Sequence, residues 1–240
     1  MGTSEWLVFE NTGAGFADEP LHWPLPTPIA ADWLDDLAED TYVGCAEDYY
    51  AVSTLDLTGD GLPDLVQTDA CDVAGVGTTS WRVFENTGTG FAATPIEWAL
   101  PDALERDWLD DLYEDTYVGC DEDYYAVSTL DLTGDGRPDL VMTDDCDTAG
   151  IGTNAWLVFE NQGDGFASTP LEWALPRGPE RDWLDDLAED TYVGCAEDYY
   201  AASTLDLTGD GVPDLVMTDD CDTAGVGTTS WKVFPGRCED

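Results

Sequence analysis

A repeat of 75 residues is the feature that most restricts what this chain can fold into. The segment Trp-Leu-Val-Phe-Glu-Asn-Thr-Gly at 6–13 returns, with small changes, at positions 81, 156 and 231, each 75 residues after the last. A fixed period of this length indicates units that pack on their neighbours instead of folding alone. We therefore expect one repeat domain over residues 1–240. Its units lie at about 2–76, 77–151 and 152–226, and 227–240 forms a terminal closing strand.

Four short segments in each repeat have the residues typical of β-strands. In one copy they lie at 50–57, 63–68, 80–85 and 91–98, where β-branched and aromatic residues are separated by turns rich in glycine. Such turns between apolar runs predict β-hairpins. Four strands in a unit too small to stand alone are typical of propeller blades and stacked β arrays. The sequence therefore predicts an all-β protein of three four-stranded, blade-like repeats with pseudo-threefold symmetry.

An acidic loop connects the first two predicted strands of every repeat. At 56–64 it reads Asp-Leu-Thr-Gly-Asp-Gly-Leu-Pro-Asp, with oxygen side chains at loop positions 1, 3, 5 and 9. Ca2+ takes about six to eight oxygen ligands, and the backbone carbonyl at position 7 would supply another. A turn that binds nothing is the alternative, because Asp and Gly are common turn residues. The loop recurs twice with only position 7 changed, which favours the metal.

We therefore predict three Ca2+ ions, about one for each repeat. The predicted ligands are Asp56, Thr58, Asp60, Leu62, Asp64, Asp131, Thr133, Asp135, Arg137, Asp139, Asp206, Thr208, Asp210, Val212 and Asp214. At position 7, which Leu62, Arg137 and Val212 occupy, the ligand is the backbone carbonyl, so the side chain is left free.

Each repeat also has an acidic insertion, such as 27–48, between its fourth strand and the next first strand. Asp32 is suited to cap a short helix there, with Trp33, Leu34 and Leu37 on one face. The acidic side chains of the insertion are either a solvated surface or a second cation site. The insertion is thus expected to be short, helical and polar.

Two cysteines per repeat lie 26 residues apart. The pairs are Cys45 and Cys71, Cys120 and Cys146, and Cys195 and Cys221. A disulfide within each repeat is the simplest pairing, and a loop of this length would stabilise the fold by about 3 kcal/mol. Buried free thiols and a soft-metal site are the alternatives, although the single His22 and the lack of a Cys-x-x-Cys pair argue against zinc. Cys238 is left over, free or intermolecular.

The composition restricts the partners and the compartment. With 53 acidic and 7 basic residues, the net charge of −46 argues against nucleic acid and anionic membranes as partners. A hydrophobic content of 43% and 10 Trp argue against disorder. Regular cysteines favour an oxidising compartment, so we expect an extracellular or cell-surface protein. Residues 1–6 lack the basic and apolar regions of a signal peptide.

No motif in the sequence indicates catalysis. The phosphate-binding loop and the dinucleotide fingerprint are both absent. No Ser, His and Asp arrangement repeats, and carboxylates are too common for any pair to indicate glycoside hydrolysis. We expect a protein that is not an enzyme.

Two adjacent segments together resemble the FG-GAP/VCBS repeat family. They are Leu-Asp-Leu-Thr-Gly-Asp-Gly-Leu-Pro-Asp-Leu-Val at 55–66 and Trp-Arg-Val-Phe-Glu-Asn-Thr-Gly-Thr-Gly-Phe at 81–91. The acidic loop and the Asn-x-Gly-x-Gly-Phe hairpin follow in the family's order. The resemblance implies a β-propeller related to integrin α-subunit heads, with Ca2+ bound by Asp56, Thr58, Asp60, Asp64 and their counterparts. The disulfide-closed insertion departs from the family pattern.

Three repeats are few for a closed propeller ring. The N-terminal fourth strand at 16–23 is expected to complete the last blade and close a compact ring. The alternative is that unpaired edges join neighbouring molecules, so self-association through terminal strands stays open.

Two classes of function fit these features. The first is a calcium-stabilised, non-catalytic extracellular binding or adhesion module that holds a carbohydrate or protein ligand. Its candidate contact residues are the insertion tryptophans Trp33, Trp108 and Trp183, for which core packing is the alternative, and three equivalent sites would give avidity. The second is a structural surface or filament-forming scaffold, or an engineered minimal propeller without a natural ligand.

Overall fold

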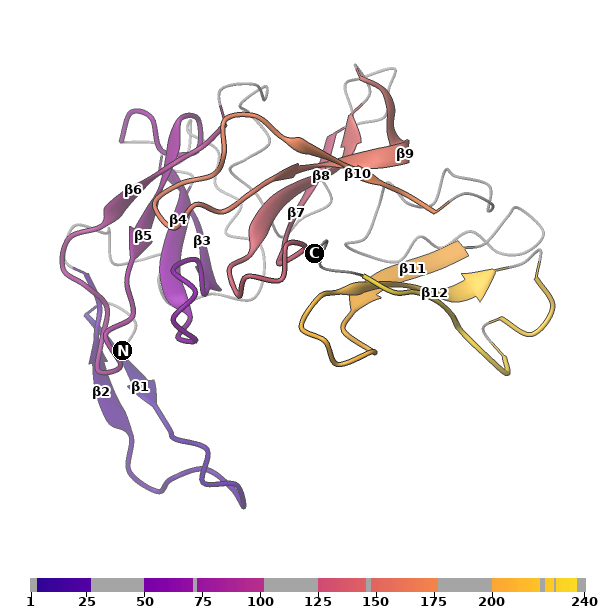
Figure 1. Cartoon of the computed structure of the whole chain (residues 1–240). Coiled ribbons are helices and arrows are strands. Elements are labelled where there is room, and N and C mark those ends of the chain that lie inside the picture. The colour runs from indigo at the N-terminus through magenta and orange to yellow at the C-terminus, as the bar shows by residue number, and fades with distance from the viewer. Residues whose placement is uncertain are drawn as a thin grey trace.

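The computed structural model describes residues 4–26, 50–70, 73–101, 125–145, 148–176, 200–220, 223–226 and 228–236. Every helix or strand in these ranges is a strand (Figure 1), which confirms the expected all-β fold for this part of the chain. The predicted helical insertions and all seven cysteines lie outside the described residues. No helix in these ranges is long and apolar enough to cross a membrane.

The strands form four antiparallel sheets in chain order. The first has two strands, the next two have four each, and the last has three. In every sheet each strand pairs with its neighbours in sequence. The strands are β1 (Glu5–Val8), β2 (Leu21–Pro24), β3 (Tyr50–Leu55), β4 (Asp64–Ala70), β5 (Ser80–Phe84), β6 (Ile96–Ala99), β7 (Tyr125–Leu130), β8 (Asp139–Asp145), β9 (Ala149–Phe159), β10 (Leu171–Ala174), β11 (Tyr200–Leu205), β12 (Asp214–Asp220) and β13 (Lys232–Phe234).

The strand register repeats with the sequence. Leu65 faces Phe84 across β4 and β5. The equivalent residues of the next two sheets, 75 and 150 positions later, also face each other. The first two strands of each sheet share an irregularity at the same place, directly after Ala51 in the first copy. Alternating apolar side chains fix the register, because a slip by one residue would turn the buried face to solvent.

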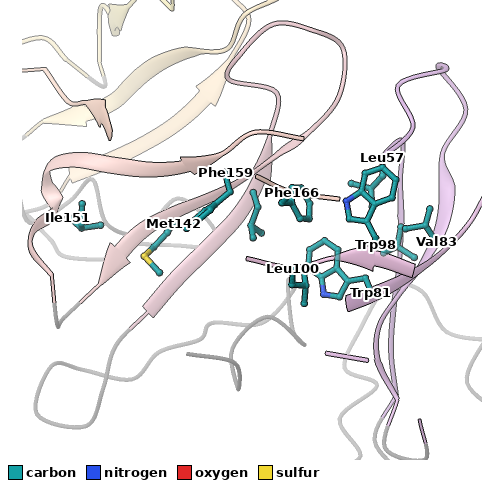
Figure 2. Close-up of a cluster of buried hydrophobic side chains, with 11 residues drawn as sticks. Leu57, Trp81, Val83, Trp98, Leu100, Met142, Ile151, Phe159 and Phe166 are labelled. Atoms are coloured by element: carbon teal, nitrogen blue, oxygen red, sulfur yellow. The ribbon is translucent and has the colours of Figure 1, made fainter. Parts of the chain in front are cut away.

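Apolar clusters join each sheet to the next. Trp81 and Trp98 of the first four-stranded sheet are fully buried in the largest cluster, together with Phe159 and Phe166 of the second (Figure 2). Another cluster joins the second four-stranded sheet to the last sheet, and a smaller one joins the N-terminal hairpin to the first four-stranded sheet. Each four-stranded sheet is therefore covered on both faces.

A phenylalanine of one repeat packs against a tryptophan pair of the preceding repeat. Trp81 faces Trp98 across β5 and β6, and the ring of Phe166 lies edge-on to both, with centroids 5.4 Å and 6.3 Å away. Trp6 and Trp23 hold Phe91 in the same way, at 5.5 Å and 6.1 Å. Edge-on aromatic pairs add about 0.5–1.5 kcal/mol beyond area burial. This packing of a phenylalanine on two tryptophans, which we call the joint between repeats, therefore forms twice among the described residues.

The N-terminal strand does not complete the last sheet, contrary to the expected ring closure. β2 pairs with β1 in a sheet of its own, and within the described ranges β13 pairs only with β12. Figure 1 shows the β1–β2 hairpin and the β11–β12 pair at opposite sides of the view, with the other sheets between them. The physical reason is the Phe91 joint, which holds the hairpin against the first four-stranded sheet.

Candidate metal-binding loops

The three acidic loops join β3 to β4, β7 to β8 and β11 to β12. In the first, the carboxylate of Asp56 accepts hydrogen bonds from the backbone N–H groups of Gly59, Asp60 and Gly61, at 2.9, 3.1 and 2.8 Å. Asp131 and Asp206 accept from the equivalent three groups at 2.6 to 3.1 Å. Each loop thus winds around its first carboxylate. Gly59 and Gly61 have φ of 75° and 87°, which only glycine adopts without strain.

The last aspartate of each loop is fully buried. The Asp64 carboxylate accepts from the N–H of Thr58 at 3.1 Å and from the N–H of Asn86 at 2.9 Å. Asp139 and Asp214 make the equivalent bonds, the latter to Thr208 and Gly236. This residue therefore connects the acidic loop to the turn that follows the third strand.

Burial and hydrogen bonding act in opposite directions on these three carboxyls. Burial raises the pKa of Asp64 and Asp139, and the backbone N–H donors offset it only in part. Burial also acts to raise the pKa of Asp214, but donors from Thr208, Gly236 and Leu207 hold it below its usual value. The third loop therefore favours the ionised form of this aspartate most strongly.

The side chain of Arg137, at position 7 of the second loop, is not free as predicted but is hydrogen-bonded within the loop. Its Nε and Nη2 donate to Oδ2 of Asp135 at 3.1 and 2.5 Å. Partial burial acts to raise the pKa of Asp135, but the hydrogen bonds and charge of Arg137 lower it overall. The Arg137 side chain also reaches the first loop, since a Cβ on Gly59 would meet its Cγ. The second loop thus has a built-in cation beside a predicted metal ligand.

The asparagine of the Asn-x-Gly-x-Gly-Phe hairpin also contacts the loops. Asn161 is buried, and its Nδ2 donates to the carbonyl of Pro138 at 3.0 Å and to that of Leu57 at 2.9 Å. Asn86 makes the equivalent bond to Pro63 at 2.9 Å. The sequence pattern predicts the hairpin but gives no role for this asparagine. Its recurrence at Asn11, Asn86 and Asn161 was the available signal, although the fourth copy has Gly236 at this position.

The donor set suits a hard cation, although the described residues show no assembled acidic cluster. Within the described ranges, no group of three or more His, Cys, Asp or Glu side chains is arranged so that it could hold a metal ion. The hydroxyls of Thr58 and Thr133, at position 3, are buried without a hydrogen-bond partner, whereas that of Thr208 donates to Asp214 at 3.5 Å. A buried polar group without a partner costs about 1–3 kcal/mol, and a cation in the loop would satisfy it. A carboxylate oxygen can accept an N–H and bind a metal together. The residues therefore fit Ca2+.

Several predicted site residues lie outside the described ranges. They are Trp33, Trp108 and Trp183 in the insertions and Cys45, Cys71, Cys120, Cys146, Cys195, Cys221 and Cys238. The disulfides and the insertion tryptophans therefore stay predictions.

No protein-family model and no curated protein matches the chain. Among solved structures, the Tc holotoxin pore of Photorhabdus luminescens is similar over 91% of this chain and 8% of its own, at 20% identity and a TM-score of 0.48. The TcdB2–TccC3 structure covers 79% of this chain and 7% of its own, at 21% identity and a TM-score of 0.42. A lectin of Agrocybe aegerita that recognises non-reducing terminal N-acetylglucosamine is similar over 88% of this chain and 41% of its own, at 19% identity and a TM-score of 0.40. The chain thus spans less than a tenth of the toxin chains.

Proposed function

We propose that this protein is a non-catalytic, calcium-stabilised extracellular binding module of FG-GAP/VCBS type. The observation that carries the proposal is the first aspartate of all three loops, around which three backbone N–H groups converge. This arrangement fixes the carboxylate before a cation arrives. Asp60, Thr58 and the carbonyl of Leu62 follow at the spacing that Ca2+ loops use.

The bound cation would stabilise the folded state in two ways. It would satisfy the buried Thr58 and Thr133 hydroxyls, and it would offset part of the self-repulsion of a chain with a net charge of −46. Asp64 and its counterparts would couple cation binding in the loop to the stability of the sheet, because they accept hydrogen bonds both from the loop and from the backbone of the Asn86 turn. Ligand binding to the native state alone then adds stability by mass action.

The module would act on a multivalent ligand through its repeated units. Equivalent surfaces on three repeats bind a repeated carbohydrate or protein surface with avidity, provided that the geometry allows simultaneous contact. The second candidate function is a structural scaffold. It is favoured by the aromatic joint between repeats, which forms twice with the same partners.

Calorimetric titration tests the metal part of the proposal. After treatment with EGTA and dialysis, the chain is expected to bind about three Ca2+ ions, with Mg2+ as the control cation. A variant with Asp60, Asp135 and Asp210 all replaced by Asn is expected to lose most of this binding. Absence of Ca2+ binding by the folded wild-type chain would overturn the proposal.

Glycan arrays and protein capture on the Ca2+-loaded chain test the binding part. The matched control is the Asn variant of the three loops, which keeps the surface outside them. Ligand binding that requires Ca2+ supports the module. A chain that binds Ca2+ but holds no ligand supports the scaffold.

A further inference from the structure

Two apolar surfaces of the chain are exposed although their counterparts in other repeats are buried. On the last sheet, Trp231 is 55% exposed, whereas Trp81 and Trp156 at the equivalent positions are 0% and 2% exposed. Leu207 and Val233, whose counterparts Leu57 and Val83 share a buried cluster with Trp81, are also exposed. We call Leu207, Trp231 and Val233 the acceptor surface, because their counterparts around Trp81 receive Phe166.

The second surface belongs to the N-terminal hairpin. Phe16 is 72% exposed and Phe9 is 46% exposed, whereas their counterparts Phe166 and Phe159 are 5% and 0% exposed. Phe166 is the residue that packs edge-on against Trp81 and Trp98. We call Phe9 and Phe16 the donor surface. The donor surface thus corresponds to the phenylalanine side of a contact that the chain already forms within itself, and Trp231 corresponds to Trp81, the nearer of the two tryptophans in that contact. The last sheet has three strands in the described ranges, without a counterpart of β6 and its Trp98.

We propose that the donor surface of one copy of this chain docks on the acceptor surface of a second copy, head to tail. Phe16 would meet Trp231 as Phe166 meets Trp81. Phe91 packs against Trp6 and Trp23 and so holds the hairpin on the first four-stranded sheet, and within the described ranges β1 and β2 pair only with each other. The donor surface therefore does not meet the last sheet of its own chain, and the partner is a second copy. Repetition of this contact builds a linear assembly, because a head-to-tail joint uses different surfaces on the two copies.

Charge sets the conditions under which the joint forms. Each copy has a net charge of −46, so copies repel one another at low ionic strength. The apolar contact acts at short range, whereas the repulsion is screened beyond about 3 Å at 1 M salt and beyond about 30 Å at 0.01 M. Association is therefore expected to strengthen as salt rises, in contrast to a joint held by ion pairs.

Sedimentation velocity on the full chain tests the proposal, in EGTA and in Ca2+ so that it is separate from metal binding. The wild type is expected to form concentration-dependent oligomers that increase from about 0.05 M to about 1 M NaCl. Phe16→Ser and Trp231→Ser each remove one surface without changing the charge. Each is expected to weaken association by about tenfold or more. Leu171→Ser is the control, because Leu171 is 44% exposed but lies on β10, outside both surfaces.

A mixture of the Phe16→Ser and Trp231→Ser variants gives the decisive result. Each variant keeps one intact surface, so the mixture is expected to form heterodimers and nothing larger. Circular dichroism establishes that both variants fold. A wild type that stays monomeric at every salt concentration overturns the proposal. So does a variant that associates as well as the wild type, or a mixture that does not associate.

Discussion

The side-chain amide of Asn161 donates to the carbonyl oxygen of Leu57 at 2.9 Å, across 104 positions of the chain. Leu57 lies in the acidic loop of the first four-stranded sheet and Asn161 in the hairpin of the second. The bond joins two predicted calcium loops, because Asn161 also donates to the carbonyl of Pro138 in the acidic loop of its own sheet. Asn161 is therefore a link between repeats as well as a turn residue.

Replacement of Asn161 by Ala is expected to destabilise the fold by about 1–3 kcal/mol, because it removes the donor to the buried carbonyl of Leu57 and to the partly buried carbonyl of Pro138. Urea unfolding measures the change. Asn11→Ala is the matched control, because Asn11 has the same place in the exposed N-terminal hairpin. Equal losses in the two variants would show that the bond to Leu57 contributes nothing.

Replacement of Phe166 by Ala is expected to cost about 3–5 kcal/mol, since it opens a cavity against Trp81 and Trp98. Phe16→Ala at the equivalent position should change stability by less than about 0.5 kcal/mol, because Phe16 is exposed. Thermal unfolding at low salt compares the two. A small loss at Phe166 would contradict the joint between repeats.

Gly59 and Gly209 have the same loop position and the same φ of 75°. An Ala at Gly209 is expected to cost about 1–2 kcal/mol of backbone strain alone, since a Cβ there meets nothing within 4 Å. An Ala at Gly59 should cost more, because its Cβ would also meet Arg137. Urea unfolding of both variants measures the difference. It should shrink in an Arg137→Ala background, and persistence of the full difference there would argue against the contact.

Arg137→Leu is expected to strengthen Ca2+ binding at the second loop, because the guanidinium no longer pairs with Asp135. The wild type should accordingly show two tighter sites and one weaker site by calorimetry. Arg82→Leu removes an equal charge from β5 and serves as the control. Three identical sites in the wild type would contradict this prediction.

The disulfide prediction is tested by intact mass under non-reducing conditions. Each of the three predicted pairs should lower the mass by two hydrogens relative to the reduced chain, and Cys238 should remain reactive toward a thiol reagent. Reduction should lower the thermal unfolding temperature, because each crosslink restricts the unfolded chain. Seven reactive thiols in the untreated chain would exclude the disulfides.

The sequence by itself determined the local features of this protein. The 75-residue period, the all-β content of the described part and the position of each acidic loop follow from alternation, glycine placement and repetition, which act over a few residues. The expected fourth strand at 91–98 was too long, because β6 begins at Ile96 and Phe91 packs instead against Trp6 and Trp23.

Only the tertiary structure decided how the repeats meet. Near-identical units give no signal for which copy contacts which, so the bond from Asn161 to Leu57 and the contact of Arg137 with Gly59 were not predictable. The same ambiguity affected the N-terminal hairpin, whose sequence suits either the last sheet or the first four-stranded sheet. The Phe91 joint decides it, because burial of an aromatic ring between two tryptophans depends on the assembled faces and not on local sequence.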